Sequence, residues 1–367
     1  LTGADLEEAN LTSAGLAAAD LTNANLRMTD LDDADLSGAV LIDANLRYAT
    51  LTSANLLDAD LTRAKLFQAN LTDAILTGML GVAHRYGDGI EFAIIAMGRY
   101  GGQELSFSSD ADILYVYRPA GSEPEEAQKR AEGIGRELSQ LSQDLRLPLD
   151  LDIDLRPEGT QGPLARSLDS YTVYLRRWAE VWERHALLRA RGIAGDDAVL
   201  RGFDALREHA AWTRPPSDDD RREVRRLKAR GETERFPGGL EPWRHCKLGP
   251  GGLRDIEFTI QLLQLVHGLH DDRVRQPDTL GALASLAEHG YIGRVEAAEF
   301  SRDYRFLRVV EHRIQLSRLR RTHLMPRDEG VLRVLAHIGM IERADGLDDV
   351  DVPMRANRSS WVRAPRG

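Results

Sequence analysis

Residues 92–117 read FAIIAMGRYGGQELSFSSDADILYVY, two apolar runs separated by a glycine turn and a pair of aspartates. Because side chains i and i+2 of a strand point to the same face, Asp110 and Asp112 should present their carboxylates side by side where the second strand begins. The turn Gly101-Gly102 lies about eight residues upstream, where backbone N–H groups could hold phosphate oxygens. Two adjacent carboxylates are costly without a cation between them, so the stretch predicts a site for Mg²⁺ and a nucleotide triphosphate.

A further source of carboxylates follows along the chain. Residues 149–155 alternate strictly between an apolar residue and Asp, which predicts a half-buried strand with Asp150, Asp152 and Asp154 on one face. In a mixed sheet this strand can lie beside the first pair of aspartates and supply a third carboxylate. Between the two, residues 123–143 have the apolar spacing of an amphipathic helix.

Composition excludes several classes of protein. With 367 residues and 42% hydrophobic residues, the chain is long enough for two or three domains. Its formal net charge of −10 is not that of a nucleic-acid-binding protein, so a nucleic-acid partner is not expected. The single cysteine, Cys246, rules out a disulfide framework and favours a reducing compartment. No apolar run reaches membrane-spanning length and no signal peptide is visible, so we expect a cytoplasmic protein without a membrane partner.

The first 80 residues contain a repeat of five. Leu stands at every fifth position from Leu1 to Leu76, and Ala precedes these leucines by two residues except at Thr29. A period of five fits neither a helix nor a flat strand. It fits a square solenoid with one pentad on each side and Leu and Ala in the interior, and it resembles the pentapeptide-repeat family. Twenty residues then form one coil, which gives about four coils.

The surface of this repeat is acidic, since residues 1–80 carry twelve carboxylates against four basic side chains. The resemblance allows one functional interpretation, a DNA mimic that binds a topoisomerase. The other interpretation is a solvated scaffold, because acidic surfaces also confer solubility, and we favour it.

From Asp169 to about residue 340 the sequence predicts helices. The first, from Tyr171 to Arg191, carries a stripe at helical spacing that we interpret as core rather than as a ligand site: Tyr174, Trp178, Trp182 and His185. Further helices are predicted over residues 219–231, 254–269, 279–289, 294–321 and 329–338. The stretch after residue 342 is polar and without periodicity, which predicts a disordered tail.

Six motifs then occur in order along the chain. They are Met97-Gly98-Arg99, Gly101-Gly102-Gln103-Glu104-Leu105, Ser109-Asp110-Ala111-Asp112, Asp152 with Leu155-Arg156-Pro157-Glu158-Gly159, Trp182-Glu183 with Ala186-Leu187-Leu188-Arg189-Ala190-Arg191, and Lys247-Leu248-Gly249 with Gly251-Gly252-Leu253-Arg254-Asp255-Ile256-Glu257. In this combination residues 90–340 resemble one catalytic half of the bifunctional glutamine synthetase adenylyltransferase/adenylyl-removing enzyme.

The two resemblances together imply a multidomain chain. We expect a right-handed quadrilateral β-helix over residues 1–80 and an α+β nucleotidyltransferase catalytic domain over residues 81–195. An all-α helical bundle over residues 196–342 and a tail over residues 343–367 should follow.

The enzyme family implies the chemistry. AMP passes from ATP to a tyrosine of glutamine synthetase, or is removed by phosphorolysis with phosphate to give ADP, in the control of nitrogen assimilation. The implied cofactors are Mg²⁺ and ATP, and the implied partners are glutamine synthetase and a PII signal protein. By motif, Asp110, Asp112 and Asp152 are the catalytic metal ligands, with Asp154 second in line for the third place. The implied nucleotide-binding residues are Gly98, Gly101, Gly102, Ser109 and Arg156.

Two alternatives remain open at this point. Arg99, Arg156, Arg166 and Lys247 are candidate phosphate partners because cationic side chains suit phosphate, although for each of them a surface salt bridge explains the charge as well. The chain could also act as a pentapeptide-repeat binding protein whose nucleotidyltransferase-like module is inactive or regulatory. The complete set of three carboxylates favours the enzyme.

Overall fold

The computed structural model divides into two compact units. The first comprises Leu1–Ala96, Asp112–Tyr174 and Arg191–Ala205, and the second comprises Met97–Ala111, Leu175–Ala190 and Leu206–Gly367. The residues that the structure describes are 1–47, 49–51, 54–56, 59–61, 63–65, 89–106, 109–143, 150–233, 241–318, 321–328 and 330–332. The predicted domain boundaries at residues 80, 195 and 342 stay predictions, and the end of the repeat and the predicted tail lie outside the described residues.

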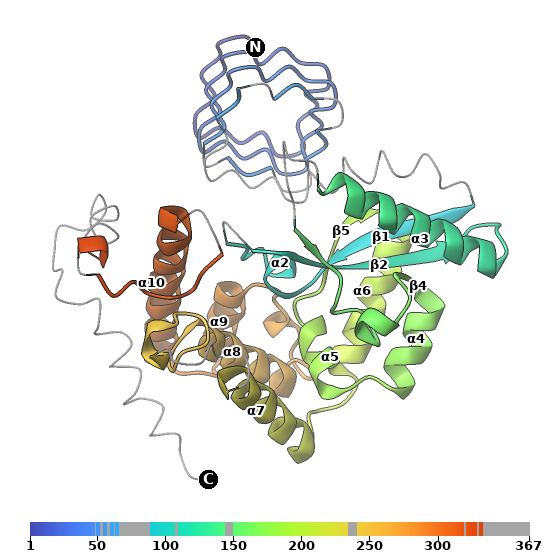
Figure 1. The fold of residues 1–367 in the computed structure, drawn as a ribbon, viewed down its shortest axis with the longest axis vertical. Helices are drawn as coiled ribbons and strands as arrows, with labels where there is room; N and C mark the ends of the chain where they lie inside the picture. Colours follow the sequence, from blue (N-terminus) through green and yellow to red (C-terminus); the bar gives the residue numbers. More distant parts are fainter. Residues whose placement is uncertain are drawn as a thin grey trace. The chain divides into compact units, whose positions relative to one another are not determined.

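The repeat forms stacked four-sided coils, as its period predicts (Figure 1). Parallel bridges join residues one coil apart, from Asp5 with Asn25 to Asn45 with Lys65. Leucines 21 to 51 and the alanines between them are buried in the interior, with exposures of 0–1%. Hydrogen bonds such as that from Leu26 N–H to Asn45 C=O, 2.8 Å long, connect successive coils. A narrow interior therefore explains why a small residue must alternate with each Leu.

Thr29 interrupts the alanine column and is fully buried. Its hydroxyl donates a 2.8 Å hydrogen bond to the carbonyl oxygen of Leu6 in the preceding coil. The one polar side chain in that column therefore has a partner, which removes most of the cost of burying it.

The first unit also contains a mixed sheet in the order β3-β2-β1-β5, with β4 paired to β2. Strand β1 (Ile90–Ala96) is antiparallel to both β2 (Ala111–Pro119) and β5 (Arg191–Gly195), and β4 (Ala165–Ser167) is parallel to β2. The two apolar runs around the glycine turn are therefore adjacent central strands. Their burial on both faces accounts for the lack of alternation in the sequence.

Helix α3 (Pro124–Leu141) packs on the sheet (Figure 1) and confirms the helix predicted at 123–143. Its buried stripe consists of Ala127, Ala131, Ile134, Gly135 and Leu138. A Cβ on Gly135 would lie 2.9 Å from the ring of Tyr115 in β2, so glycine permits the close approach of helix and sheet.

The predicted helix over residues 171–191 is wrong in extent. The chain instead forms α4 (Leu168–Arg177), α5 (Val181–Leu187) and then strand β5. A capping box between Glu180 and Glu183 begins α5 as a separate helix. Gly195 has φ +123°, and a Cβ there would lie 2.2 Å from the carbonyl oxygen of Phe92, so glycine lets β5 fit against β1. Pairing with β1 thus overrides the local helical pattern.

The aromatic stripe on this segment is only partly core. Tyr174 and Trp182 are half-buried and His185 is buried, whereas Trp178 is 60% exposed. The break after α4 removes Trp178 from the face that a single continuous helix would have buried.

The predicted strand at 149–155 is also wrong in extent. Within its described residues, only Leu151–Asp152 form strand β3. After Asp152 the backbone turns, since the N–H of Asp154 donates to Oδ1 of Asp152 at 2.8 Å. Aspartate favours such a turn because its side chain can replace a strand partner.

The second unit is helical. It contains α7 (Asp218–Thr233), α8 (Leu253–His267), α9 (Thr279–Glu288) and α10 (Arg294–Arg318), which confirm the predicted helices at 219–231, 254–269, 279–289 and 294–321. Helix α6 (Asp197–Trp212) precedes them, and the short helices are α2 (Gly98–Gly101), η2 (Gly159–Gln161), η3 (Pro242–Arg244) and η4 (Asp272–Val274). Of the helix predicted at 329–338, residues 330–332 are described and are helical.

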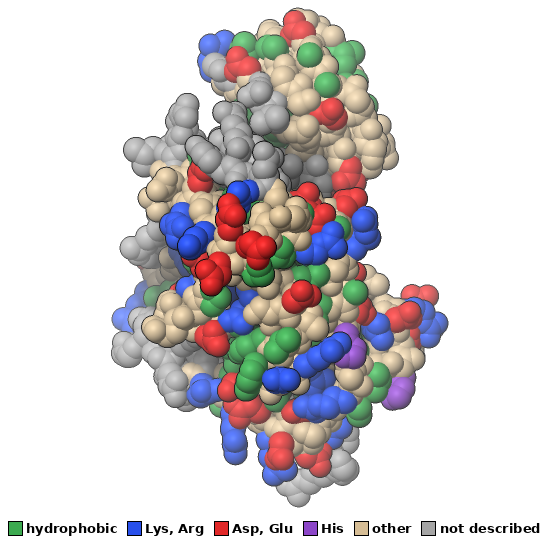
Figure 2. Space-filling view, turned by 90° about the vertical axis from the view of Figure 1, so that its right-hand side faces the viewer, with side chains coloured by type: hydrophobic (Ala, Val, Ile, Leu, Met, Phe, Trp, Pro, Cys, Tyr) green, Lys and Arg blue, Asp and Glu red, His purple; other side chains and the backbone are tan. Residues whose placement is uncertain are grey.

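Helices α8, α9 and α10 pack against one another around a buried core (Figure 1) that includes Ile256, Leu283 and Leu307. Among the described residues, no helix is long and apolar enough to cross a membrane. On the face drawn in Figure 2, acidic and basic side chains are interspersed.

Candidate active site

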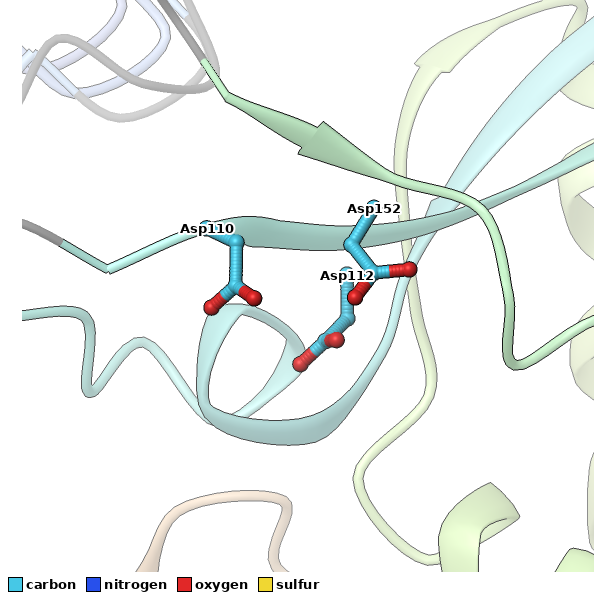
Figure 3. A group of neighbouring side chains, drawn as sticks. All are labelled: Asp110, Asp112 and Asp152. Atoms are coloured by element: carbon cyan, nitrogen blue, oxygen red, sulfur yellow. The ribbon is translucent and has the colours of Figure 1, made fainter.

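Three aspartates converge where β2 begins (Figure 3). Asp110 immediately precedes β2, Asp112 is its second residue, and Asp152 ends the neighbouring β3. One carboxylate oxygen from each can be chosen so that all three lie within 4.8 Å of one another, and each residue is half-buried. Figure 3 shows the carboxylates turned to the same side of the strands. The alternation of β2 and its pairing with β3 place them there.

Asp152, not Asp154, supplies the third carboxylate of this group. The N–H of Asp154 donates to Oδ1 of Asp152 and holds that carboxylate in place. The side chain of Asp154 is 65% exposed, and its nearest basic atom is Nη1 of Arg156 at 3.6 Å. The turn after β3 therefore separates two aspartates that a regular strand would have put on one face.

The donor set fits a magnesium ion. Mg²⁺ takes carboxylate oxygens at about 2.1 Å, so ligand atoms on opposite sides of the ion are about 4.2 Å apart. The 4.8 Å limit of this group differs from that by a few tenths of an ångström, which side-chain rotation can supply. Three carboxylates this close also repel one another, and a divalent cation offsets that repulsion. Within the described part of the chain, this is the one group of acidic, histidine or cysteine side chains with such spacing.

The glycine turn next to the first strand is the single helical turn α2. Gly98 takes φ +53° at its start, and Gly101 and Gly102 are buried. The N–H of Gly101 donates to Met97 C=O at 2.8 Å and that of Gly102 to Gly98 C=O at 3.2 Å. These two N–H groups are thus used inside the turn. A role for Gly98, Gly101 and Gly102 beside a triphosphate stays a prediction, and it depends on donors other than these two.

Gly102 is glycine for a packing reason. A Cβ there would lie 3.0 Å from the carbonyl oxygen of Pro277, in the segment before α9. The turn therefore packs closely on the helical part of its own unit.

Ser109 ends a turn directly before Asp110. Its N–H donates to Ser106 C=O at 3.0 Å, and the two hydroxyl oxygens are 2.7 Å apart. This turn fixes the backbone one residue before the first carboxylate. Its geometry supports a positioning role for Ser109, and direct contact with a nucleotide stays a prediction.

Arg156 braces the loop that follows Asp152. Its Nη1 donates to Ile153 C=O at 2.8 Å, its Nε donates to Gly162 C=O at 3.4 Å, and its side chain is only 12% exposed. Arg166 donates to Oε2 of Glu158 at 2.7 Å and lies 5.2 Å from the ring centre of Tyr174. Both arginines thus have protein partners in this structure, and phosphate binding by either stays a prediction.

Arg99 is buried and paired with two glutamates. It is 8% exposed, with Nη1 2.7 Å from Oε1 of Glu311 and Nε 3.3 Å from Oε1 of Glu257. Burial alone raises the pKa of Glu311, but the hydrogen bond from His323 and the positive charges of Arg99 and Arg308 hold it well below its ordinary value. The interpretation of Arg99 as a surface salt bridge is therefore wrong, because the pair is buried, and phosphate binding by Arg99 stays a prediction.

This ion pair belongs to a buried group of charges that the sequence reasoning missed, here called the arginine network. Its members are Arg99, Glu104, Arg189, Glu257, Thr279, Arg308 and Glu311. Glu104 accepts from the N–H and hydroxyl of Thr279 at 2.7 and 2.9 Å and lies 2.9 Å from Nη1 of Arg189. The signal in the sequence was Glu257 within the apolar segment Ile256–Ile260, because a charge at such a position needs a buried partner.

Arg308 connects this network to the strand that carries the aspartates. Its Nη2 donates to Glu104 C=O at 2.7 Å and to Leu105 C=O at 2.9 Å, and its Nη1 lies 2.5 Å from Oε2 of Glu311. Helix α10 therefore holds the backbone of the segment that leads to Asp110.

Three family models match parts of this chain. Residues 54–205 match the family model of glutamate-ammonia ligase adenylyltransferase, residues 221–356 match that of GlnD PII-uridylyltransferase, and residues 1–38 match pentapeptide repeats. Solved structures similar to the repeat include the pentapeptide-repeat protein HetL from Nostoc, with 42% identity, 20% of this chain and 37% of that chain covered, and a TM-score of 0.14.

Two relatives share the name bifunctional glutamine synthetase adenylyltransferase/adenylyl-removing enzyme. The protein from Leifsonia xyli is 43% identical over 267 residues, which are 72% of this chain and 26% of the relative. That from Mycolicibacterium smegmatis is 41% identical over 293 residues, which are 77% of this chain and 28% of the relative. The chain thus spans about a quarter of the length of these relatives.

By these matches residues 54–205 form a segment similar to the glutamate-ammonia ligase adenylyltransferase family, in a chain that begins with a pentapeptide repeat. That segment is related to the bifunctional glutamine synthetase adenylyltransferase/adenylyl-removing enzymes and corresponds to one part of them.

Proposed function

We propose that residues 90–340 form a Mg²⁺-dependent nucleotidyltransferase that transfers AMP from ATP to a tyrosine of glutamine synthetase, or removes it by phosphorolysis. The observation that carries the proposal is the convergence of Asp110, Asp112 and Asp152 in a chain about 40% identical to enzymes of that name. It also argues against an inactive module, because three mutually repelling carboxylates would not be needed without a cation.

Asp110, Asp112 and Asp152 are the residues that would hold Mg²⁺. Bound there, the ion supplies positive charge that offsets the negative charge developing on the α-phosphate. The rest of the work falls to the protein. The N–H of Asp154 holds Asp152, the Ser106–Ser109 turn holds the backbone before Asp110, and Arg308 fixes the segment before that turn.

The transfer itself is a displacement at the α-phosphorus. The phenolic oxygen of the substrate tyrosine forms a bond to that phosphorus, the bond to the bridging oxygen breaks, and pyrophosphate leaves as the phenolic proton passes to solvent. In the removing direction, phosphate attacks the same phosphorus, the bond to the tyrosine oxygen breaks, and ADP is formed. Both directions need the same alignment of attacking and leaving oxygens, so one carboxylate group can serve either.

The test is transfer of label from α-labelled ATP to glutamine synthetase by the full chain and three variants. Asp112→Asn and Asp152→Asn should each lower the rate by about 100-fold or more, because each removes charge directed at the reacting phosphate. Asp154→Asn is the matched control and should stay within about threefold of wild type, since its side chain lies outside the group and its N–H is retained. Undiminished labelling by Asp112→Asn would contradict the proposal.

The same variants test the reverse direction. Adenylylated glutamine synthetase incubated with the chain and phosphate should release ADP, and Asp112→Asn should not support that release. A chain active in neither direction, with either substrate form, would also contradict the proposal. The PII partner that the family resemblance implies belongs to the proposal as well, and a change of either rate on adding a PII protein would support it.

A further inference from the structure

Two cationic side chains of the second unit, Lys247 and Arg321, interact with each other, and Arg321 also contacts Asp110. Residues 244–246 pair with residues 323–325, since Cys246 N–H donates to His323 C=O at 2.9 Å and Met325 N–H donates to Arg244 C=O at 2.8 Å. The pairing is antiparallel, with a bridge between His245 and Leu324. The chain turns after this bridge, since Gly249 N–H donates to His245 C=O at 2.8 Å, and Lys247 in that turn lies near enough to Arg321 for their charges to interact.

Arg321 reaches the first of the three aspartates. Its Nη1 lies 2.7 Å from Oδ2 of Asp110, while 48% of its side chain is exposed. Arg321 is therefore anchored at one end of the carboxylate group and is also open to a ligand from solvent.

Lys247 has no such partner. Within the described part of the chain, its ammonium group has neither a hydrogen bond nor an ion pair, although its side chain is half-buried. Burial lowers its pKa, and the charges of Arg99 and Arg321 lower it further, while Glu257 and Glu311 act in the opposite direction. The nearby carboxylates Glu257 and Glu311 are already paired with arginines of the arginine network.

Counting charges shows what is missing. The arginine network with Lys247 and Arg321 contains five cations, Arg99, Arg189, Arg308, Lys247 and Arg321, and these face four carboxylates, Glu104, Glu257, Glu311 and Asp110. When a metal ion takes Asp110, two cations are left without a counter-charge. Two neighbouring uncompensated cations, one of them half-buried and the other exposed to solvent, favour a ligand with at least two negative charges.

The glycine-rich loop after Lys247, residues 249–252, does not bind this ligand through its backbone N–H groups. Its N–H groups are used internally, from Gly252 to Gly249 C=O at 2.9 Å and from Leu253 to Cys246 C=O at 2.9 Å. A Cβ on Gly249 would lie 2.2 Å from Pro242 C=O, so the glycine serves tight packing. The loop therefore fixes the position of Lys247 and leaves recognition of an anion to side chains.

We propose that Lys247 and Arg321 form the subsite for the terminal phosphates of a nucleoside triphosphate. In the absence of a metal ion Asp110 pairs with Arg321, and binding of the ion to that carboxylate releases Arg321 for the phosphates. The proposal rests on the proposed function for the metal, but it assigns a new pair of phosphate ligands. It also gives Asp110 a second role, because its carboxylate competes with the phosphates for Arg321.

The experiment measures binding of inorganic tripolyphosphate to the full chain in metal-free buffer by calorimetry. Asp110→Asn removes the charge that competes with the ligand for Arg321. It should tighten binding by about tenfold, because the ligand no longer has to break the ion-paired hydrogen bond between Arg321 and Asp110. Arg321→Gln and Lys247→Gln should each weaken it by about tenfold, and adding Arg321→Gln to Asp110→Asn should abolish the gain. Arg327→Gln, which removes the same charge from the same segment at a side chain 68% exposed, should change affinity by less than about twofold.

The outcomes separate this proposal from the proposed function. Tripolyphosphate that does not bind wild type, or that binds Asp110→Asn and Arg321→Gln as it binds wild type, overturns the subsite even if AMP transfer is normal. The predicted pattern of affinities supports the subsite even in a chain that fails to transfer AMP. If Lys247→Gln lacks the circular dichroism spectrum of wild type, the exposed Arg321 and its conservative variant Arg321→Lys, which should retain most binding, still decide the question.

Discussion

Nη1 of Arg99 lies 2.7 Å from Oε1 of Glu311, across 212 residues of sequence and with both side chains buried. Arg99 is in the short helix α2, which follows strand β1, and Glu311 is on α10. With Arg308 holding the carbonyl groups of Glu104 and Leu105, this pair ties the turn and the approach to Asp110 to the helices of the second unit. The site therefore depends on charges that never reach solvent.

We expect Arg99→Met to destabilise the chain by about 3–5 kcal/mol, because it leaves Glu257 and Glu311 buried with one positive partner fewer. Urea denaturation followed by tryptophan fluorescence measures the change in free energy of unfolding. Arg118→Met is the matched control, since its pair with Glu91 is half-exposed, at 50% and 26%, and should cost less than about 1 kcal/mol. Equal losses in the two variants would show that the buried pair has no special weight.

The burial of His185 leads us to expect that the free energy of unfolding falls in mild acid. Burial, helped by the charges of Arg189 and Arg254, lowers its pKa to about 3, and its ring contacts that of Phe258 with centres 4.7 Å apart. The unfolded chain binds a proton at this residue below about pH 6.5 and the folded chain does not, so its stabilising contribution is present above pH 6.5 and is lost as the pH falls toward 3. Between pH 7.5 and 5.5 this single residue should cost about 1.4 kcal/mol.

The check on His185 is the pH dependence of the free energy of unfolding. His185→Leu should remove that part of the loss, whereas His209→Leu, at an exposed position of α6, should keep it. The same slope in His185→Leu and wild type would mean that other groups cause the acid sensitivity.

The hydrogen bond of Thr29 and the tight interior of the solenoid predict losses of stability for two substitutions, each for a different reason. Thr29→Val keeps the volume but takes the donor from Leu6 C=O, so it should lower stability by about 1 kcal/mol. A second substitution in the same interior, Ala24→Thr, places a threonine where the chain has alanine. It adds atoms to a fully buried column and should cost about 1–3 kcal/mol of stability. Thermal denaturation followed by circular dichroism compares both with wild type, and a stabilised Ala24→Thr would contradict the packing argument.

The sequence could predict the elements whose pattern is local. The repeat of five predicts the coils, the spacing of β2 predicts that Asp110 and Asp112 lie together, and apolar periodicity predicts α3 and α8. It could not predict strand β5, because pairing with β1 and the +123° backbone of Gly195 decide that segment. Nor could alternation choose between Asp152 and Asp154, since the N–H of Asp154 ends the strand early.

The arginine network was beyond sequence reasoning for a similar reason. Apart from Arg308–Glu311, its pairs join residues far apart in the chain, as Arg99–Glu257 and Glu104–Thr279 do. No local pattern marks which distant arginine a buried glutamate will meet. Only the apolar surroundings of Glu257 hinted that its charge would be neutralised inside the protein.

Magnesium alone should stabilise the folded chain if the three aspartates bind it. A ligand that binds only the folded state adds RT ln(1 + [L]/Kd), which is about 1.4 kcal/mol at tenfold excess over Kd. Asp112→Asn should abolish this gain and Asp154→Asn should keep it, as measured by unfolding with and without Mg²⁺. Equal stabilisation of wild type and Asp112→Asn would place the bound ion elsewhere.

Arg321→Gln should make Mg²⁺ bind more tightly in the absence of nucleotide. In wild type an ion must displace the guanidinium group that lies 2.7 Å from Oδ2 of Asp110, and the positive charge of that group also repels the ion. Removing it should lower the Kd for Mg²⁺ by up to about fivefold, because an exposed pair contributes up to about 1 kcal/mol. Arg327→Gln should leave the Kd unchanged, so titration of Mg²⁺ into these two variants and wild type decides the matter. Weaker magnesium binding by Arg321→Gln would mean that Arg321 orients Asp110 for the ion rather than competing with it.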